Sequence, residues 1–326
     1  MTTLGALLRV VAVLGALLAS ALAILAFFGF AVPEFDLFNH AQPLLFAGTL
    51  IGLLLVLTQL SGGLRLTVGS VVVLGVVASS AIVVPEFLAG LRPLPAAGDR
   101  PVIRLMTHNA FGVDERPEDV SAAIREEDAD ILVFQEYFGA TALHPLLREH
   151  YPYYVICRGG KRANLGLYSR IPFEQVEDGA CPENAYTTTR TAHILVRFTQ
   201  PDGTSFSVMT THMDWPLPVA RQNQQLEALR EVVDSVDGPL VLAGDFNSTP
   251  WSYALRNFVE DAGLDRVTAN IWTYPKRWYQ FGRWWPALPV LPLDHVMVRG
   301  VRVQAVHTGA PTASDHLPVV VEFSVD

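Results

Sequence analysis

The stretch PLVLAGDFN at residues 239–247 joins a run of apolar residues to a polar turn. The run PLVLA has the length and composition of a buried β-strand. Gly244 and the polar residues that follow it, as far as Pro250, favour a turn. A sharp turn at a strand end presents the Asp245 carboxylate and the Asn247 amide from a rigid support. One motif of this kind carries little weight, but the pattern recurs along the chain.

Other short polar signatures also close apolar runs. VIRLM precedes Asn109 in THN, DILVF precedes Gln135 and Glu136 in QE, and FSVMT precedes His212 in TTH. LDH at 293–295 and SDH at 314–316 complete the ordered set. Side chains at the ends of neighbouring strands converge on one rim of a sheet. Acid, amide and imidazole groups on such a rim predict a site for a metal and a phosphate.

Strands and helices alternate around these signatures. Candidate helices cover 117–127, which opens with Pro and two acids, 218–236, which has an apolar stripe at Leu226, Leu229 and Val233, and 250–262. This mixture predicts an α/β domain rich in sheet. The strand-like runs are 102–108, 130–135, 153–157, 165–169, 191–199, 205–211, 239–244, 294–299, 301–307 and 317–325.

The ordered signatures resemble the endonuclease/exonuclease/phosphatase superfamily, the Mg2+-dependent phosphoesterases related to deoxyribonuclease I. The resemblance covers roughly residues 101–326, and GDFN and SDH are its most specific parts. It implies a four-layer α/β sandwich, in which two packed β-sheets have helices on their outer faces. The first hundred residues take no part in it.

Three long uncharged stretches precede this region, at 10–33, 41–64 and 66–85. Each is about as long as the twenty residues that cross a bilayer. A cleaved signal peptide does not fit, because the first stretch is too long and two more follow it. A buried helical bundle is the alternative. We predict a transmembrane region at 1–87, a linker at 88–100 rich in Pro, Gly and Ala, and a catalytic domain at 101–326.

The basic residues near the spans predict an orientation. Arg9 and Arg65 flank the spans on one side, whereas the loop on the other side has Glu34 and Asp36 but no Lys or Arg. The positive-inside rule then places the catalytic domain outside the cytoplasm. Cys157 and Cys181 both fall in that domain, where an oxidising environment favours a disulfide over two buried thiols.

The charge balance weighs against nucleic acid as the main partner. Residues 101–326 hold nineteen basic and twenty-eight acidic residues, and no basic stripe is visible among them. Proteins that grip duplex nucleic acid carry clustered Lys and Arg. We therefore expect the bilayer as one partner, and a lipid or small-molecule phosphoester as substrate.

Glu136 is the best candidate ligand for a metal in the predicted site. Mg2+ prefers hard oxygen ligands and needs only one or two protein carboxylates. Asn109 offers an amide oxygen and Asp315 a second carboxylate, and the resemblance assigns the same three positions to the metal. Mg2+ is the expected cofactor, with Mn2+ as an alternative. Some nuclease members have an acid where this chain has Phe111, which leaves one metal or two as an open question.

Asp245 and the histidines supply the expected chemistry. Asp245 can accept a proton from the attacking water while Asn247 orients water or phosphate. His316 can stabilise charge on phosphate oxygens, and the resemblance assigns Asp294 as its partner. His212 is expected to contact phosphate or to help protonate the leaving oxygen. His108 and His295 are excluded, because alternation along a strand points them to the opposite face.

The segment 271–292 (IWTYPKRWYQFGRWWPALPVLP) combines seven aromatic residues with Lys276, Arg277 and Arg283. It ends directly before Asp294, so we expect it to overhang the site. Base stacking, contact with lipid headgroups, a substrate lid and a flap over a sheet edge all fit this composition. Because the chain also has a predicted transmembrane region, we favour contact with lipid headgroups over base stacking.

These features predict a membrane-anchored, Mg2+-dependent phosphoesterase that hydrolyses a phosphodiester or a phosphomonoester. An extracytoplasmic nuclease acting on DNA or RNA is the first alternative, and a non-catalytic module that binds phosphorylated ligands is the second. Calcineurin-like phosphatases also carry a GD motif, but this chain lacks the His-rich signatures that hold their two metals.

Overall fold

The structure is a computed structural model that describes residues 3–96, 98–111, 116–137, 140–158, 162, 164–180 and 191–325. The chain separates into two compact units. The first unit comprises Met1–Leu91 and Pro250–Arg256, and the second comprises Arg92–Thr249 and Asn257–Asp326.

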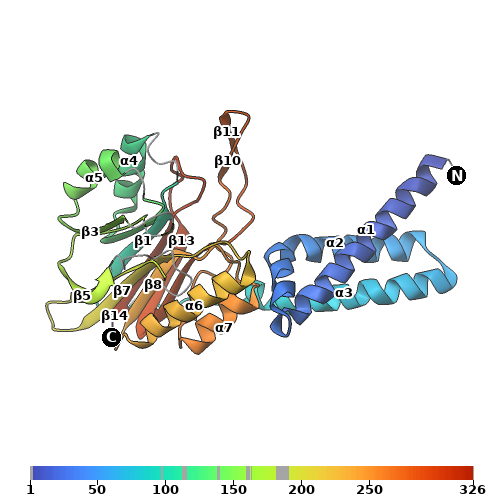
Figure 1. Cartoon of the computed structure of the whole chain (residues 1–326), viewed down its shortest axis with the longest axis horizontal. Coiled ribbons are helices and arrows are strands. Elements are labelled where there is room, and N and C mark those ends of the chain that lie inside the picture. The colour runs from blue at the N-terminus through green and yellow to red at the C-terminus, as the bar shows by residue number, and fades with distance from the viewer. Residues whose placement is uncertain are drawn as a thin grey trace. The chain divides into compact units, whose positions relative to one another are not determined.

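Three long helices make up most of the first unit (Figure 1). A Cβ atom added at Gly52 would lie 2.7 Å from Cβ of Ala16, and one added at Gly75 would lie 2.6 Å from Cβ of Ser20. Such close approach through small residues is common between helices in a bilayer. The elements are α1 (Thr3–Phe27), η1 (Phe28–Phe30), η2 (Pro33–Ala41), α2 (Gln42–Gln59) and α3 (Gly62–Ala89).

The outward faces of these helices remain apolar. Leu14, Leu54 and Leu66 are among the many large side chains that they expose. Helices that are apolar on all sides are suited to a lipid environment. The segments Arg9–Phe30, Pro33–Gln59 and Gly62–Ala89 are each long and apolar enough to cross a membrane.

Two six-stranded sheets form the second unit. Both are mixed, and in each the central pair is parallel: β1 with β2 and β7 with β8. The first sheet has the order β13 (Val301–Thr308), β14 (Val319–Val325), β1 (Ile103–Asn109), β2 (Ile131–Gln135), β4 (Asn164–Ser169), β3 (Tyr153–Arg158). The second has the order β5 (Phe173–Ala180), β6 (His193–Thr199), β7 (Ser205–His212), β8 (Leu240–Asp245), β12 (Asp294–Arg299), β9 (Asp265–Arg266).

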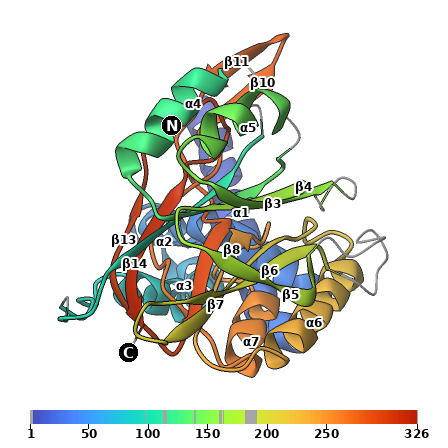
Figure 2. The same cartoon turned by 90° about the vertical axis from the view of Figure 1, so that its left-hand side faces the viewer.

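The sheets pack face to face and have helices on their outer faces, as Figure 2 shows. Alternate residues of both sheets, such as Leu105 and Val133 from one and Val241 and Val296 from the other, fill the layer between them. The outer face of the first sheet packs on α4 (Pro117–Glu127) and α5 (Ala140–Arg148). The second sheet is covered by α6 (Val219–Asp234) and α7 (Tyr253–Asp261). The four-layer sandwich that the sequence predicts is thus confirmed.

All ten strand-like runs of the sequence become strands, and the three predicted helices become α4, α6 and α7. Four further strands and α5 were not predicted. Two of these strands, β10 (Arg277–Gln280) and β11 (Arg283–Pro286), form a separate hairpin within the aromatic segment. The division at residues 87 and 100 stays a prediction.

Cys157 lies buried on β3 and is disulfide-bonded. Its predicted partner, Cys181, lies outside the described residues.

Candidate active site

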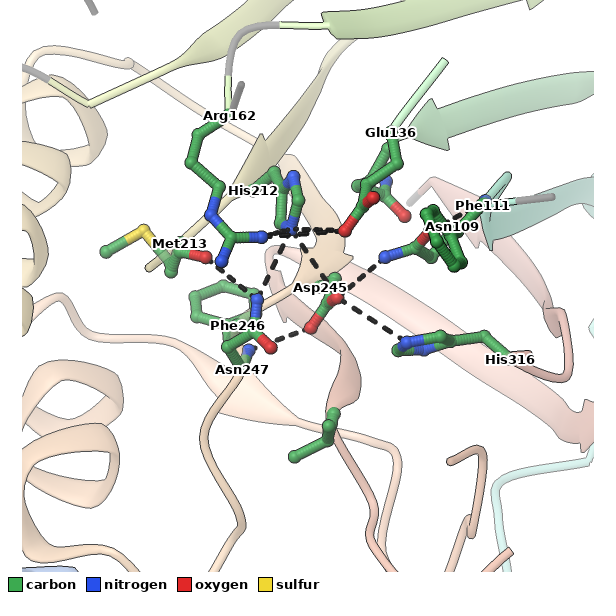
Figure 3. Close-up of polar contacts among 12 residues, drawn as sticks. Asn109, Phe111, Glu136, Arg162, His212, Met213, Asp245, Phe246, Asn247 and His316 are labelled. Carbon is green, nitrogen blue, oxygen red and sulfur yellow. Dashed lines mark hydrogen bonds and ion pairs between the residues drawn. The ribbon is translucent and has the colours of Figure 1, made fainter. Parts of the chain in front are cut away.

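The predicted site residues come together because the two parallel strand pairs end at the same rim. Asn109 and Gln135 are register partners at the ends of β1 and β2. His212 and Asp245 are register partners at the ends of β7 and β8, and Asp294 pairs with Asp245 from β12. Across the two sheets, the Asn109 amide donates a 2.8 Å hydrogen bond to Oδ2 of Asp245. Figure 3 shows Asn109, His212 and Asp245 pointing toward one another.

The turn after β8 needs its own backbone geometry. A Cβ atom at Gly244 would lie 2.1 Å from the carbonyl oxygen of Thr211 on β7, so a larger residue would push the strands apart. Asn247 has a φ of 48°, and its backbone N–H donates a 2.8 Å hydrogen bond to Oδ1 of Asp245. Its side-chain amide donates to the carbonyl oxygen of Met213 at 2.9 Å. These bonds hold Asp245 and Asn247 in one arrangement.

Glu136 also has left-handed backbone geometry, with a φ of 49° directly after β2. A non-glycine residue in this region is uncommon, and such strain gathers at functional sites. The carboxylate of Glu136 is half-buried, with Oε1 3.6 Å from Nε2 of His212. The residue before it, Gln135, donates a 2.9 Å hydrogen bond to Thr210 of the opposite sheet. Gln135 therefore fastens the two sheets together while Glu136 faces the site.

Asp294 and His316 form a buried ion pair beside Asp245. Nδ1 of His316 lies 2.7 Å from Oδ2 of Asp294, and Nε2 lies 3.9 Å from Oδ2 of Asp245. Burial lowers the pKa of His316, but the charge and hydrogen bond of Asp294 outweigh it and raise the pKa to about 10. His316 is therefore an imidazolium at neutral pH, aimed at Asp245.

Burial disfavours the charged forms of two further acids near His316, Asp245 and Asp315. It raises the pKa of Asp245 to about 7, although His316 opposes the shift. It also raises the pKa of Asp315 to about 6, again against His316, and the negative charge of Glu136 adds to this rise. Several carboxylates thus face a shared space in which a further positive charge would be stabilised.

Arg162 enters the site from the segment before β4 and was not predicted as a site residue. It is 5% exposed, and its Nε donates a 2.9 Å hydrogen bond to Oδ1 of Asp214. Its Nη1 lies 2.6 Å from Nε2 of His212 and 3.5 Å from Oε1 of Glu136. The only sequence signal was a basic residue four positions before the glycine of NLGLYS, which is too weak to assign a role.

The contact with Arg162 determines the protonation of His212. A guanidinium can only donate hydrogen bonds, so Nε2 of His212 accepts and its proton is on Nδ1. The side-chain amide of Asn247 lies 3.3 Å from the same nitrogen as a second donor. In this arrangement His212 cannot donate a proton from Nε2. Both predicted roles of His212, contact with phosphate and protonation of the leaving oxygen, stay predictions.

Helix α6 supports Arg162 through Asp214. Arg221 forms a 2.6 Å ion pair with Oδ2 of Asp214, and the side-chain oxygen of Gln225 accepts the Asp214 backbone N–H at 2.9 Å. Gln222 donates to the Asp214 carbonyl oxygen at 2.9 Å. The buried face of α6 thus begins with glutamines and continues with the predicted leucines and valine.

The donor set fits a divalent metal ion. Oδ1 of Asp315 is buried and has no hydrogen-bond partner among the described residues. Glu136 lies close enough to raise the pKa of Asp315 by its charge. Oδ1 of Asn109 accepts the Phe111 backbone N–H at 3.0 Å and keeps a second lone pair. Oxygen ligands of this kind suit Mg2+.

A second grouping of potential ligands overlaps the proton-handling residues. Asp245, Asp294 and His316 have ligand atoms within 4.8 Å of one another. The 2.7 Å bond between His316 and Asp294 already occupies one atom of each. Oδ1 of Asp294 has no hydrogen-bond partner among the described residues, so this grouping also offers oxygen to a metal. Glu136, Asp315 and Asn109 stay the ligands that the sequence predicts.

An aromatic wall borders the site on the side of the hairpin. The ring of Tyr274 lies 4.8 Å from that of His316 and 6.2 Å from that of Trp215. Burial raises the pKa of Tyr274, and the charges of Asp315, Asp245 and Glu136 add to the rise. The backbone N–H of Lys276 donates a 2.6 Å hydrogen bond to the carbonyl oxygen of Asp315. The aromatic segment is therefore attached directly to the SDH motif.

Other polar residues of the signatures are used in packing. His295 binds the Ser248 carbonyl oxygen at 2.8 Å, and His108 lies 2.8 Å from the Thr312 hydroxyl. Burial lowers the pKa of each to about 3, which keeps both neutral. Their exclusion from the site agrees with these contacts. Ser314 donates to the Asn109 carbonyl oxygen at 2.7 Å, so the serine of SDH ties this loop to β1.

The sequence of residues 106–316 matches the model of the Endonuclease/Exonuclease/phosphatase family. A curated relative, a UPF0294 protein of Yersinia pseudotuberculosis, is 35% identical over 127 residues, which are 37% of this chain and 44% of the relative. The alignment thus spans less than half the length of that relative.

Two solved structures have a similar fold. A family protein from Bacteroides thetaiotaomicron has a TM-score of 0.51 at 18% identity, and the match covers 71% of this chain and 97% of that one. Sphingomyelinase C from Streptomyces griseocarneus has a TM-score of 0.50 at 20% identity, covering 69% and 100%. At these identities the likeness establishes the fold and not the substrate.

Proposed function

We propose that this chain, which belongs to the endonuclease/exonuclease/phosphatase family, is a membrane-anchored, Mg2+-dependent hydrolase of phosphoesters. One observation carries the proposal. A buried carboxylate, Asp245, lies where the two sheets meet, with the Asn109 amide 2.8 Å away on one side and the cationic His316 3.9 Å away on another. A proton acceptor and a fixed positive charge thus flank one small space.

Asp245 is suited to accept the proton of an attacking water. Burial raises its pKa to about 7, close to neutral pH, where a general base works best. Asn109 and the Asn247 backbone each donate a hydrogen bond to it at 2.8 Å, so the carboxylate cannot rotate freely. The bond between water and phosphorus forms as the proton moves to Asp245, and the ester oxygen leaves.

Two cations are placed to stabilise the negative charge on the phosphate. His316 is held as an imidazolium by Asp294 at 2.7 Å. Arg162 is permanently charged, and its link to Asp214 keeps it directed at His212 and Glu136. Fixed charges in a buried site stabilise a transition state without having to reorganise.

Glu136 and Asp315, with the free lone pair of Asn109, would hold the metal ion. When bound, Mg2+ or Mn2+ supplies positive charge to phosphate oxygens. The raised pKa of Asp315 and the unpartnered Oδ1 atom support this assignment. A cation there would offset the repulsion among the carboxylates.

We infer that the three apolar helices anchor the protein and that the catalytic domain is extracytoplasmic. The helices have the length and apolarity to cross a membrane. The basic residues Arg9 and Arg65 favour the orientation, and the disulfide of Cys157 supports an oxidising compartment.

The proposed substrate is a phosphodiester or phosphomonoester on a lipid or small molecule. The acidic charge of residues 101–326 supports this class over nucleic acid. A nuclease remains the second candidate, because exposed aromatic residues near the site could stack bases. A binding module without catalysis has less support, since the base, the paired histidine and the acids are all assembled.

The proposal is tested on the full-length protein in nanodiscs, with Mg2+ or a chelator. The substrates are a soluble phosphodiester and phosphomonoester, phospholipids, sphingomyelin, and single- and double-stranded DNA. Wild type is compared with Asp245→Asn and with Asp237→Asn, a matched change at an exposed acid. We expect Mg2+-dependent turnover that only Asp245→Asn abolishes. Turnover of no substrate by folded protein that binds Mg2+ would favour the binding module.

A further inference from the structure

The aromatic hairpin, β10 and β11 with the turn Phe281–Gly282 between them, makes its own two-stranded sheet. Figure 1 shows it extending away from the two large sheets. A hairpin of two strands alone is marginally stable in water. No residue of this hairpin is buried, so its aromatic side chains are not part of the core of the domain.

The tip exposes three large rings. Trp278 is 56% exposed, Tyr279 is 62% exposed and Phe281 is 86% exposed. Leu288 and Val290, just beyond β11, are also exposed. Several large apolar side chains exposed on one small element indicate an interaction site.

The turn places a phenylalanine where local preference disfavours it. Phe281 has a φ of 53° and Gly282 a φ of 75°, as in a two-residue hairpin turn that prefers Asn-Gly. Phe281 is thus both strained and exposed to water. Strain of this kind persists where it serves a function, and here it brings a large ring to the end of the hairpin.

Cations cover the indole rings of β11. The guanidinium of Arg277 lies 3.9 Å from the ring centre of Trp284, and that of Arg283 lies 3.5 Å from that of Trp285. Arg side chains can keep their charge in water while their stems and partners lie against apolar material. Trp and Tyr combined with Arg are typical of the headgroup layer of a membrane.

The side chains favour a bilayer over a single-stranded nucleic acid. Bases stack on rings, but Leu288 and Val290 offer no ring, whereas a lipid surface accepts aliphatic and aromatic groups alike. The hairpin and Lys276 carry three basic residues and no acid within a region whose net charge is −9, which complements anionic headgroups. The same chain carries three helices suited to a membrane, which would keep a lipid surface within reach.

The base of the hairpin joins the site. Tyr274 contacts the His316 ring, and the Leu317 backbone N–H donates to the Thr273 carbonyl oxygen at 2.9 Å. The Phe111 ring meets Trp284 edge to face with centres 6.0 Å apart. The base of the hairpin is therefore connected to the segment that carries Asp315 and His316.

We propose that the aromatic hairpin inserts its tip into the headgroup layer of a lipid bilayer and presents a lipid phosphoester to the strand-end site. The docking itself rests on the exposed rings, the strained tip and the paired cations. The choice of lipid phosphoester as substrate rests in addition on the proposed function.

Docking is tested without catalysis. Phe281→Cys in the full-length protein is labelled with an environment-sensitive fluorophore, and the protein is reconstituted into vesicles of phosphatidylcholine and phosphatidylglycerol in equal amounts. Asp237→Cys, at an exposed position on another loop, is the matched control. We expect a blue-shifted emission that spin-labelled phospholipids quench at position 281 only. Equal exposure of both probes to water would overturn the proposal, as would a response at 281 to single-stranded DNA and not to lipid.

The link to catalysis is tested with the triple variant Trp278→Ser/Tyr279→Ser/Phe281→Ser. Its hydrolysis of a bilayer lipid phosphodiester should fall at least about tenfold, while that of soluble bis-para-nitrophenyl phosphate stays within about twofold. The conservative variant Trp278→Phe/Tyr279→Trp should keep both activities. Equal losses on both substrates, or none on either, would contradict the link. If wild type hydrolyses neither, the proposed function fails, and the fluorescence result still decides docking.

Discussion

The strand-end site and the aromatic hairpin lie next to each other but are built in opposite ways. In the site, side chains such as Asn109, Asp245 and His316 are buried and bonded across two sheets. In the hairpin, Trp278 and Phe281 are exposed, and two strands with stacked arginines provide the local support. The strand-end site thus holds its reactive groups in fixed positions, whereas the aromatic hairpin can adapt to a deformable or variable surface.

This difference suggests how one fold serves several substrates. The chemistry depends on groups fixed by strands, where a small displacement is costly. Selection of the substrate can depend on an added element that the core does not need. Changes in the site should therefore lower activity on every substrate, while changes in the hairpin should alter only which substrates are used.

The largest effect is expected from Asp245→Asn. Loss of a general base lowers kcat by about a thousandfold. The single amide oxygen can accept only one of the two hydrogen bonds that Asn109 and Asn247 donate to Oδ2 and Oδ1 of Asp245, so thermal unfolding of the variant is measured beside its activity. Rates on a soluble and on a lipid phosphoester should fall alike, as measured by phosphate or alcohol release. If Asp245→Asn were impaired on the lipid alone, Asp245 would select the substrate and would not be the general base for every substrate.

Asp294→Asn should change the pH dependence of the rate. Asp294 raises the pKa of His316, to about 10 in the wild type. Without this carboxylate the pKa falls, so His316 loses its proton at a lower pH and the alkaline limb of the profile moves down. At pH values between the acidic and the alkaline limb of the profile, we expect the rate to fall about a hundredfold. Asp265→Asn, at an exposed strand, is the control, and an unmoved limb would disprove the pairing.

Arg162→Gln should lower kcat/KM by about tenfold, the value of one charge-assisted hydrogen bond. Arg162→Lys should recover little, because an ammonium cannot reach Asp214 and His212 with two separate nitrogens as the guanidinium does. Arg148→Gln, at an exposed position, controls for charge. Full activity of the lysine variant would show that Arg162 contributes charge alone.

The smallest effect is expected on stability at the hairpin. Phe281→Ser should change the free energy of unfolding by no more than about 0.5 kcal/mol, because its ring is exposed. Gly244→Ala should destabilise strongly, since its Cβ would meet the Thr211 carbonyl oxygen at 2.1 Å. Thermal unfolding of both variants measures this contrast. A large loss with Phe281→Ser would mean that the hairpin is part of the core.

Much of the fold was predictable because its signals are local. Apolar runs that end in Asn109, Glu136, His212 and Asp245 identify strands from neighbouring residues alone. Convergence of the strand ends follows from the parallel pairing of β1 with β2 and of β7 with β8, which the structure shows. The sandwich itself came from the resemblance, not from periodicity.

The missed features depend on contacts between distant segments. Arg162 becomes important only when Asp214 and His212 lie beside it. The tautomer of His212 depends on that same contact. Strand β5 and helix α5 have weak patterns, and the hairpin is encoded by aromatic residues that also suit other structures.

Hydrolysis at the strand-end site is tested most simply by isotope incorporation. The full-length protein turns over its substrate with Mg2+ in water enriched in heavy oxygen. Water attack on phosphorus predicts one heavy oxygen in the phosphoryl product of each turnover, seen by mass spectrometry, and loss of this product with a chelator or in Asp245→Asn. Label in the alcohol product, or undiminished labelling in Asp245→Asn, would contradict hydrolysis at the strand-end site.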